Sequence, residues 1–262
     1  KVIHGNEKVM AARLADAKFF YDQDQKTPLD EHLLSLEQVT FQKHLGSLAD
    51  KTTRIEALAL DIAKQINADA KHVSRAALLC KADLMTDMVM EFPELQGTMG
   101  KYYAQLANEH HDVADALEQH YWPKFSGDAV PTQNVAAVVA LADKLDTIVG
   151  IFGIDQKPTG SKDPFALRRA ALGVIRIIQE RELTLDITHL IQTAMQSYDK
   201  LLSNKATAED VLGFILERLK ISYLDAGNTN DVVAAVMALP ITDIVDAGRK
   251  IAAVNDFKQL PQ

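Results

Sequence analysis

Hydrophobic residues recur at helical spacing along almost the whole chain, and this periodicity restricts the fold more than any other feature. Two runs show apolar residues recurring about once per helical turn: Leu33, Leu34, Leu36 and Val39, then Ile55, Leu58, Ala59 and Ile62, the second at i, i+3, i+4, i+7. β-Branched residues show essentially no alternation over four or more positions, as a half-buried strand would require. The pattern therefore predicts an all-α protein.

Turn-forming residues divide this pattern into separate helices. Turn signals lie at residues 26–28, 92–93, 123, 131, 158–164 and 227–228. We expect helices over residues 5–24, 74–90, 98–106, 111–122, 132–152, 164–181, 186–202, 207–222, 229–237 and 242–254. The segment 133–152 has a high apolar density, which indicates the central helix of the core.

The sequence is expected to form three regions. Residues 1–35 are expected to be an N-terminal helical linker, 36–157 an HD-like helical domain (see below), and 158–262 a further helical array. The second boundary rests on the turn at Pro158 and on composition, since most histidines and tyrosines precede it.

The charge of the chain limits how it can meet a nucleic acid. The chain has 262 residues, a net charge of -8 and a pI near 5.5, so its surface as a whole repels phosphates. The segment 157–181 is an exception, with a net excess of four positive charges. No run of 18 apolar residues is present, and one cysteine fits a reducing compartment, so we expect a cytoplasmic protein that contacts neither membranes nor DNA.

The most informative short motif is the segment 158–171, Pro-Thr-Gly-Ser-Lys-Asp-Pro-Phe-Ala-Leu-Arg-Arg-Ala-Ala. Asp163 is a good N-cap and Pro164 suits the first helical position. Lys162, Arg168 and Arg169 then lie where the helix dipole favours anions over cations. A phosphate backbone would suit these cations, and acids of a neighbouring helix would suit them equally.

Two further arginines extend this hypothesis. Arg176 shares a stripe with Arg169 and Gly173, and the glycine allows either a ligand backbone or a crossing helix to approach closely. Arg13 lies in a helix rich in small residues that could contact RNA or another chain. On spacing alone, a solvated Arg13 or a pair with Asp16 is favoured.

Catalytic and metal-binding motifs are weak. The eight histidines show no HExxH-like spacing, and on a helix the adjacent His110 and His111 would point about 100° apart. Cys80 follows an apolar helical run, where burial would raise its pKa and remove its reactivity. No phosphate-binding glycine loop is present. We therefore expect no catalytic residue, no metal and no cofactor in this chain.

Four segments resemble one known family, the beta subunit of bacterial glycyl-tRNA synthetase. They are residues 13–21 (Arg-Leu-Ala-Asp-Ala-Lys-Phe-Phe-Tyr), 91–104 (Glu-Phe-Pro-Glu-Leu-Gln-Gly-Thr-Met-Gly-Lys-Tyr-Tyr-Ala), 141–147 (Leu-Ala-Asp-Lys-Leu-Asp-Thr) and the motif at 158–171. The resemblance covers most of residues 5–181 and is weaker toward Gln262. It implies that the N-terminal part of such a subunit and its anticodon-binding domain lie outside this sequence.

The resemblance also implies a degenerate HD-type helical domain. HD phosphohydrolases hold metal ions with a first histidine, a His-Asp doublet, later histidines and a final aspartate. Here Cys80-Lys81 stands where the doublet is expected, and residues 51–54 (Lys-Thr-Thr-Arg) lack the first histidine. His120 and Asp143 are similar to the later ligands. Lys81 would put a positive charge in place of the metal and either pair with Asp143 or face a phosphate.

The resemblance further implies a role in charging tRNA(Gly) with glycine. In this family the alpha subunit uses ATP and Mg²⁺ for activation, and the beta subunit is needed for tRNA recognition, within a heterotetramer or larger assembly. We expect tRNA contacts at Lys162, Arg168, Arg169 and Arg176, with Arg13, Lys81 and Lys144 as lesser candidates. The alternatives are an active metal-dependent HD phosphohydrolase and a purely structural module that docks the alpha subunit.

Overall fold

The computed structural model describes residues 2–259, and this part of the chain is all-α, as predicted. Its thirteen α-helices are α1 (Val2–Asp24), α2 (Leu29–His32), α3 (Leu48–Ile66), α4 (Ala70–Leu79), α5 (Asp87–Glu91), α6 (Thr98–Leu106), α7 (His111–Gln119), α8 (Asn134–Gly153), α9 (Leu167–Glu180), α10 (Ile187–Gln196), α11 (Thr207–Asp225), α12 (Asn230–Met237) and α13 (Ile244–Lys258). Short 3-10 helices are η1 (Leu33–Gln38), η2 (Ala82–Met85) and η3 (Pro93–Leu95). None of these helices is long and apolar enough to cross a membrane.

A small hairpin is the one sheet within residues 2–259. Strands β1 (Thr40–Gln42) and β2 (Gly46–Ser47) pair antiparallel, with Thr40 opposite Ser47. The predicted helical spacing at 33–39 corresponds to η1, which ends where this hairpin begins. Ser47 then caps α3 in a capping box with Asp50, so the hairpin fixes where α3 starts.

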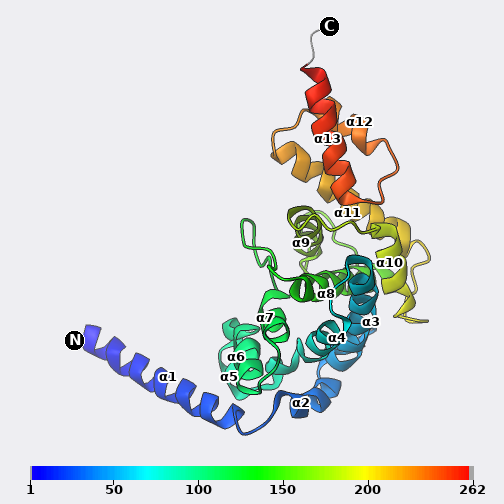
Figure 1. The fold of residues 1–262 in the computed structure, drawn as a ribbon. Coiled ribbons are helices and arrows are strands. Elements are labelled where there is room, and N and C mark those ends of the chain that lie inside the picture. Colours follow the sequence, from blue (N-terminus) through cyan, green and yellow to red (C-terminus); the bar gives the residue numbers. More distant parts are fainter. Residues whose placement is uncertain (1, 260–262) are drawn as a thin grey trace.

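Helix α8 is the centre of the core, as the apolar density of 133–152 predicts. It packs against α3, α4, α7, α9, α10 and α11 (Figure 1), and seventeen of its residues are buried. Gly150 lets the loop after α10 close onto this helix, because a side chain there would overlap Tyr198. The Tyr198 hydroxyl donates to the Asp146 carbonyl at 2.7 Å.

The predicted single helix over 74–90 is wrong, because the chain forms α4, η2 and α5 instead. Thr86 explains the restart, since its hydroxyl donates to the Asp83 carbonyl and accepts from the Val89 amide, which caps α5. The interruption leaves Lys81 between two helices with a buried side chain. A continuous helix would not turn the chain at this point.

The helix expected from Pro164 begins three residues later, at Leu167. Ala166 precedes it in the left-handed conformation, with φ of 53°. Asp163 still satisfies the helix start, because its carboxylate accepts from the amides of Leu167 and Arg168 at 2.8 and 2.9 Å. The predicted N-cap position is therefore wrong, since Ala166 is the N-cap and Pro164 lies before the helix, but the Asp163 side chain still accepts from the first two helical amides.

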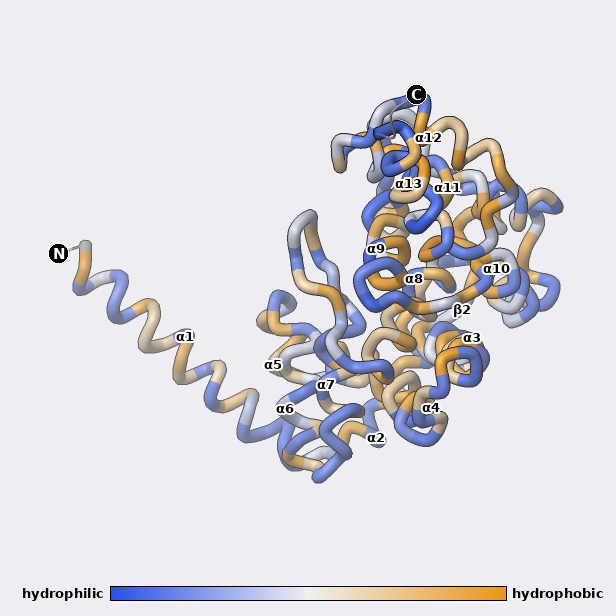
Figure 2. Tube along the Cα trace, turned by 45° about the horizontal axis from the view of Figure 1, so that its top comes forward, coloured by the Kyte–Doolittle hydropathy of each residue, from blue (hydrophilic) through white to orange (hydrophobic). Residues whose placement is uncertain are grey.

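Helix α1 extends away from the body as a single exposed helix (Figure 1). Polar and apolar residues are mixed around it, without one hydrophobic face (Figure 2). Its last residue, Asp24, is buried and accepts from the amides of Asp87 and Met88 at 2.8 and 3.0 Å and from the Tyr103 hydroxyl at 2.7 Å. These three bonds attach α1 to α5 and α6.

At the other end, α11, α12 and α13 form a lobe beyond α9 (Figure 1). The predicted boundary between 157 and 158 falls in the loop that joins α8 to α9. Because α9 and α10 pack on α8, the hydrophobic core continues across that boundary.

Candidate functional site

Buried ionic side chains meet between α3 and α8, and we call them the central ion cluster: Lys51, Arg54, Lys81, His120, Asp143 and Asp146. Helix α3 supplies Lys51 and Arg54 at i, i+3, and α8 supplies Asp143 and Asp146 at the same spacing. Residues at this spacing lie on one face of a helix, so two cations oppose two carboxylates. Lys51 Nζ lies 2.9 Å from Asp143 Oδ1 and 2.9 Å from Asp146 Oδ2. Arg54 Nε donates to Asp146 Oδ1 at 2.8 Å.

Lys81 completes the cluster from the break between α4 and η2. Its Nζ lies 2.9 Å from Asp143 Oδ2 and 2.9 Å from His120 Nε2. His120 Nδ1 lies 3.0 Å from the Ala116 carbonyl, which can only accept, so Nδ1 carries the proton and Nε2 accepts from Lys81. Of the two predicted roles for Lys81, pairing with Asp143 or facing a phosphate, the structure shows the pair with Asp143.

The protonation states follow from these contacts. Burial alone would raise the pKa of Asp143, but the ammonium groups of Lys51 and Lys81 hold it well below its usual value. Burial opposes the charged form of Lys81, yet the Asp143 carboxylate raises the pKa of this lysine. For His120, burial and the Lys81 charge lower the pKa well below its usual value. Lys81 and Asp143 are thus both charged, beside the neutral imidazole of His120.

These donors do not fit a divalent metal ion. Both oxygens of Asp143 are in contact with ammonium groups, and the free nitrogen of His120 faces Lys81. A metal ion would have to displace a protonated lysine from the position between carboxylate and imidazole. The arrangement therefore argues against the alternative of an active metal-dependent phosphohydrolase.

Lys144 lies beside the cluster and adds a further buried cation. Its Nζ donates to the carbonyls of His120 and Trp122 at 3.0 and 2.8 Å, and no carboxylate within residues 2–259 pairs with it. Burial, together with the charges of Lys81 and Lys51, lowers its pKa to about 8. Its side chain runs across α9 at Gly173, where a Cβ would lie 2.8 Å from Lys144 Cε. The glycine therefore serves the crossing of α8 and α9, the second of its two predicted roles.

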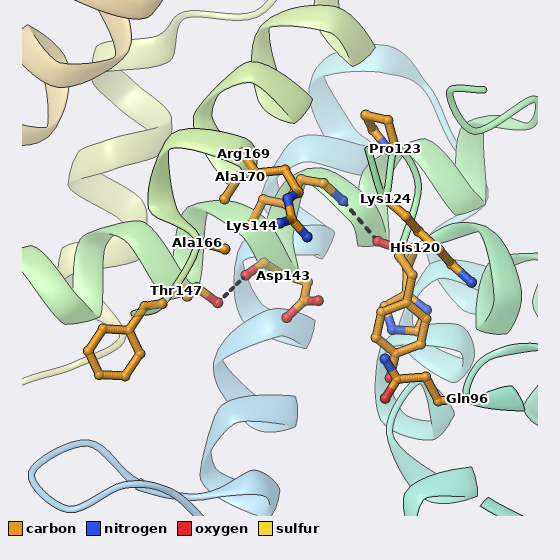
Figure 3. A pocket seen from close by; sticks show the side chains of 12 residues that line it. Gln96, His120, Pro123, Lys124, Asp143, Lys144, Thr147, Ala166, Arg169 and Ala170 are labelled. Atoms are coloured by element: carbon orange, nitrogen blue, oxygen red, sulfur yellow. Dashed lines mark hydrogen bonds between the residues drawn. The ribbon is translucent and has the colours of Figure 1, made fainter. Parts of the chain in front are cut away.

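A cavity of about 410 Å³ opens next to the cluster, between α8, the start of α9 and the segment after α7. Asp143, Lys144 and His120 form its inner wall, and Arg169 and Lys124 line it from opposite sides (Figure 3). Arg169 is exposed, and its side chain has no hydrogen-bond or ion-pair partner among the described residues. The cavity is therefore lined by more positive than negative side chains and suits an anionic group.

The other residues predicted to contact tRNA differ in their partners and in their position in the fold. Lys162 is exposed and has no carboxylate partner within residues 2–259. In the same part of the chain, the side chain of Arg168 donates only to the Gly160 carbonyl, at 2.7 Å. Arg176 pairs with Glu180 at 2.7 Å and also donates to the Asp128 carbonyl. Arg13 lies on α1, away from α9, with its guanidinium 5.1 Å from the centre of the Phe92 ring.

Two of the lesser candidates do not reach the surface. Lys81 and Lys144 are 5% and 9% exposed, and internal acceptors hold both ammonium groups. A contact of either lysine with RNA would have to break these bonds, so the structure argues against these two predicted contacts. Cys80 is buried as expected, and burial raises the pKa of its thiol to about 12.

Sequence reasoning missed four residues of this region: Lys51, Arg54, Asp146 and Lys124. The matching i, i+3 spacing of cations at 51 and 54 and of acids at 143 and 146 was a usable signal. Lys124 offered none, because it lies in an irregular segment that only the tertiary fold brings to α9.

The fold and the site define a helical protein with a cationic cavity beside a buried cluster of lysines and carboxylates. Residues 1–238 match the family model described as glycyl-tRNA synthetase beta subunit, and the chain belongs to this family. It is 54% identical over 260 residues to the glycine–tRNA ligase beta subunit of Shewanella oneidensis, covering 99% of this chain. It is 50% identical to those of Colwellia psychrerythraea and Cronobacter sakazakii, over 261 and 262 residues. The chain spans about 38% of the length of these relatives.

Proposed function

We propose that this chain contributes tRNA(Gly) recognition to glycine–tRNA ligase in the cytoplasm, as part of a heterotetramer or larger assembly. Family membership supports this role. In this proposal the alpha subunit activates glycine with ATP and Mg²⁺, and no residue of this chain takes part in the chemistry.

The exposed guanidinium of Arg169 at the cavity carries this proposal. Lys124 lines the same cavity, and Lys162 and Arg168 lie within a few residues of Arg169 on the chain. Within residues 2–259, none of these four side chains pairs with a carboxylate. Two cations without a carboxylate partner at one cavity of an acidic chain, Lys124 and Arg169, favour a phosphate ligand there.

Arg176 has a smaller part in this interface. The ion pair with Glu180 neutralises the charge of Arg176, and its guanidinium also donates to the backbone carbonyl of Asp128. Arg13 would belong to a separate contact, because α1 lies away from α9 (Figure 1).

The test is tRNA(Gly) binding by the Arg168→Ala/Arg169→Ala variant across a range of salt concentrations. Each phosphate contact releases counterions, so losing two contacts should weaken binding and reduce the slope of log K against log salt by about two. Lys43→Ala is the matched control, since Lys43 is an exposed cation in the β1–β2 turn. A salt slope unchanged in the double variant would remove both arginines from the RNA interface.

The same cations would also suit acidic residues of the alpha subunit, and we include docking of that subunit in the proposal. Arg169→Glu separates the two roles, because charge reversal repels either partner. Loss of tRNA binding with normal capture of the alpha subunit supports the RNA role. Loss of capture with intact RNA binding supports the structural module.

We also infer that the central ion cluster derives from the metal site of an HD-type domain. Of the positions predicted from the resemblance, Lys81 lies 2.9 Å from both His120 and Asp143. In this interpretation the ammonium groups of Lys51 and Lys81 supply the positive charge that a metal ion would otherwise bring.

A further inference from the structure

Three imidazoles and a carboxylate gather on the side of α4 and α7 opposite to the central ion cluster. His72 lies in the first turn of α4, and His110 is the N-cap of α7, followed by His111 and Asp112. The C-terminal ends of the same two helices lead to Lys81 and His120, which are in contact. The histidine group and the ion cluster therefore lie at opposite ends of one helix pair.

The group has the composition and spacing of a metal site. One ligand atom each from His72, His110 and Asp112 lie within 4.8 Å of one another. Asp112 Oδ2 is 3.9 Å from His72 Nδ1 and 3.6 Å from His110 Nδ1, and Oδ1 is 3.4 Å from His111 Nε2. Ligand atoms bound at about 2.1 Å from a tetrahedral ion lie about 3.4 Å from one another. Small movements of these side chains would therefore bring their ligand atoms to the spacing of a metal site.

The carboxylate of Asp112 lacks the partner that its burial requires. Its Oδ1 is buried and accepts no hydrogen bond, and within residues 2–259 no lysine or arginine pairs with it. The side chain of the nearby Arg75 forms ion pairs with Asp30 and Glu109 instead of with Asp112. A buried acceptor without a donor is unfavourable, and a bound cation would remove that unfavourable term.

The expectation that His110 and His111 cannot share a site assumed that both are helical. His110 precedes α7 in an extended conformation, so its ring lies over His72, with ring centres 3.9 Å apart and planes at 18°. Lone pairs in nearly parallel planes do not converge on one ion, so one ring must turn. The side chain of His110 is 42% exposed, and turning its ring would exchange the bond that its Nδ1 accepts from the Asp112 amide for a bond to the ion.

We propose that His72, His110 and Asp112 bind one divalent transition-metal ion of the zinc class, with His111 or water as fourth ligand. Imidazole nitrogen together with carboxylate oxygen suits Zn²⁺ better than Mg²⁺ or Ca²⁺, which prefer oxygen ligands alone. The ion joins the N-terminal ends of α4 and α7, while Lys81 and His120 join the opposite ends. The site is independent of the proposed tRNA interface.

The test is calorimetric titration of the protein with Zn²⁺ at neutral pH, with thermal unfolding measured in parallel. We expect one ion per chain and a higher Tm in its presence, because a ligand that binds only the folded state stabilises it. His72→Gln and His110→Asn should each weaken binding by about 100-fold or more. Asparagine at 110 keeps an acceptor for the cap of α7, so the helix start is preserved.

His44→Gln is the matched control, because His44 is an exposed histidine in the β1–β2 turn. Its binding should equal that of the unchanged protein. Either of two results overturns the proposal: absence of Zn²⁺ binding by the folded protein, or binding that His72→Gln leaves intact. If His110→Asn fails to fold, the His72→Gln result alone decides, since His72 makes no capping bond through its side chain.

Discussion

Lys81 Nζ lies 2.9 Å from Asp143 Oδ2 in the interior of the protein. The two groups come from elements 62 residues apart in the sequence, and each is charged because the other is present. Removing one member of such a pair leaves a buried charge without compensation, which is far more unfavourable than losing an exposed pair.

Asp143→Asn is therefore expected to destabilise the fold by about 3–5 kcal/mol, because Lys51 and Lys81 would both face a neutral amide. Urea unfolding at neutral pH measures the change. Asp246→Asn is the control, since Asp246 pairs with Lys250 at the surface and its loss should change stability by less than about 1 kcal/mol. Equal effects of both substitutions would contradict the role given to the buried pair.

Acid should destabilise the protein through His120. The pKa of His120 is lowered in the folded state. Below about pH 6.5 the imidazole therefore takes up a proton in the unfolded chain but stays neutral in the native protein. The free energy of unfolding should then fall by up to about 1.4 kcal/mol per pH unit as the pH decreases. Glutamine cannot take up this proton, so His120→Gln should show a shallower dependence between pH 7 and pH 5. Parallel curves for the two proteins would show that His120 is not the responsible group.

Lys144 predicts an effect of the same sign on the alkaline side, where stability should again rise with pH. Its pKa of about 8 means that the native side chain loses its proton before the unfolded one does. Between about pH 8 and pH 10.5 the unfolded state binds more protons, so this group makes stability rise with pH by about 1.4 kcal/mol per unit. The difference between the unchanged protein and Lys144→Met isolates the contribution from other titrating groups. The prediction fails if that difference is constant over this range.

Asp24→Ala should loosen the attachment of α1 to α5 and α6 while leaving the core folded, with the Tyr21–Tyr103 stacking contact still in place. The substitution removes the acceptor of two amides and of the Tyr103 hydroxyl. Hydrogen exchange at the Asp87 and Met88 amides should accelerate, as should proteolysis between α1 and α2. Asp22→Ala is the comparison, because Asp22 is exposed and pairs only with Lys18. Unchanged exchange in Asp24→Ala would place the attachment elsewhere.

Sequence periodicity predicts those elements whose apolar pattern is long and uninterrupted. Helix α8 is found within two residues of the expected range, because almost all of its faces are buried. The break after α4 was not predictable in this way, since it depends on hydrogen bonds of Thr86 that a helix-forming sequence does not reveal. Propensity is outweighed there by local side-chain capping.

The candidate site was predictable in part. The resemblance placed Lys81, His120 and Asp143 together, and the structure brings them into contact. Lys124 and Arg169 approach one cavity only through the packing of α9 on α8, which no local pattern encodes. The pairing of His72 with His110 likewise depends on the adjacency of α4 and α7.

The three bonds at Asp24 also make α1 a lever. Ala17, Phe20 and Tyr21 pack on the body and Arg13 lies over Phe92, so the part of α1 beyond these contacts is residues 2–12, about 16 Å long. A rotation of about 10° moves its far tip by about 3 Å. Small adjustments in α5 are thereby amplified into displacements large enough to reposition whatever α1 touches.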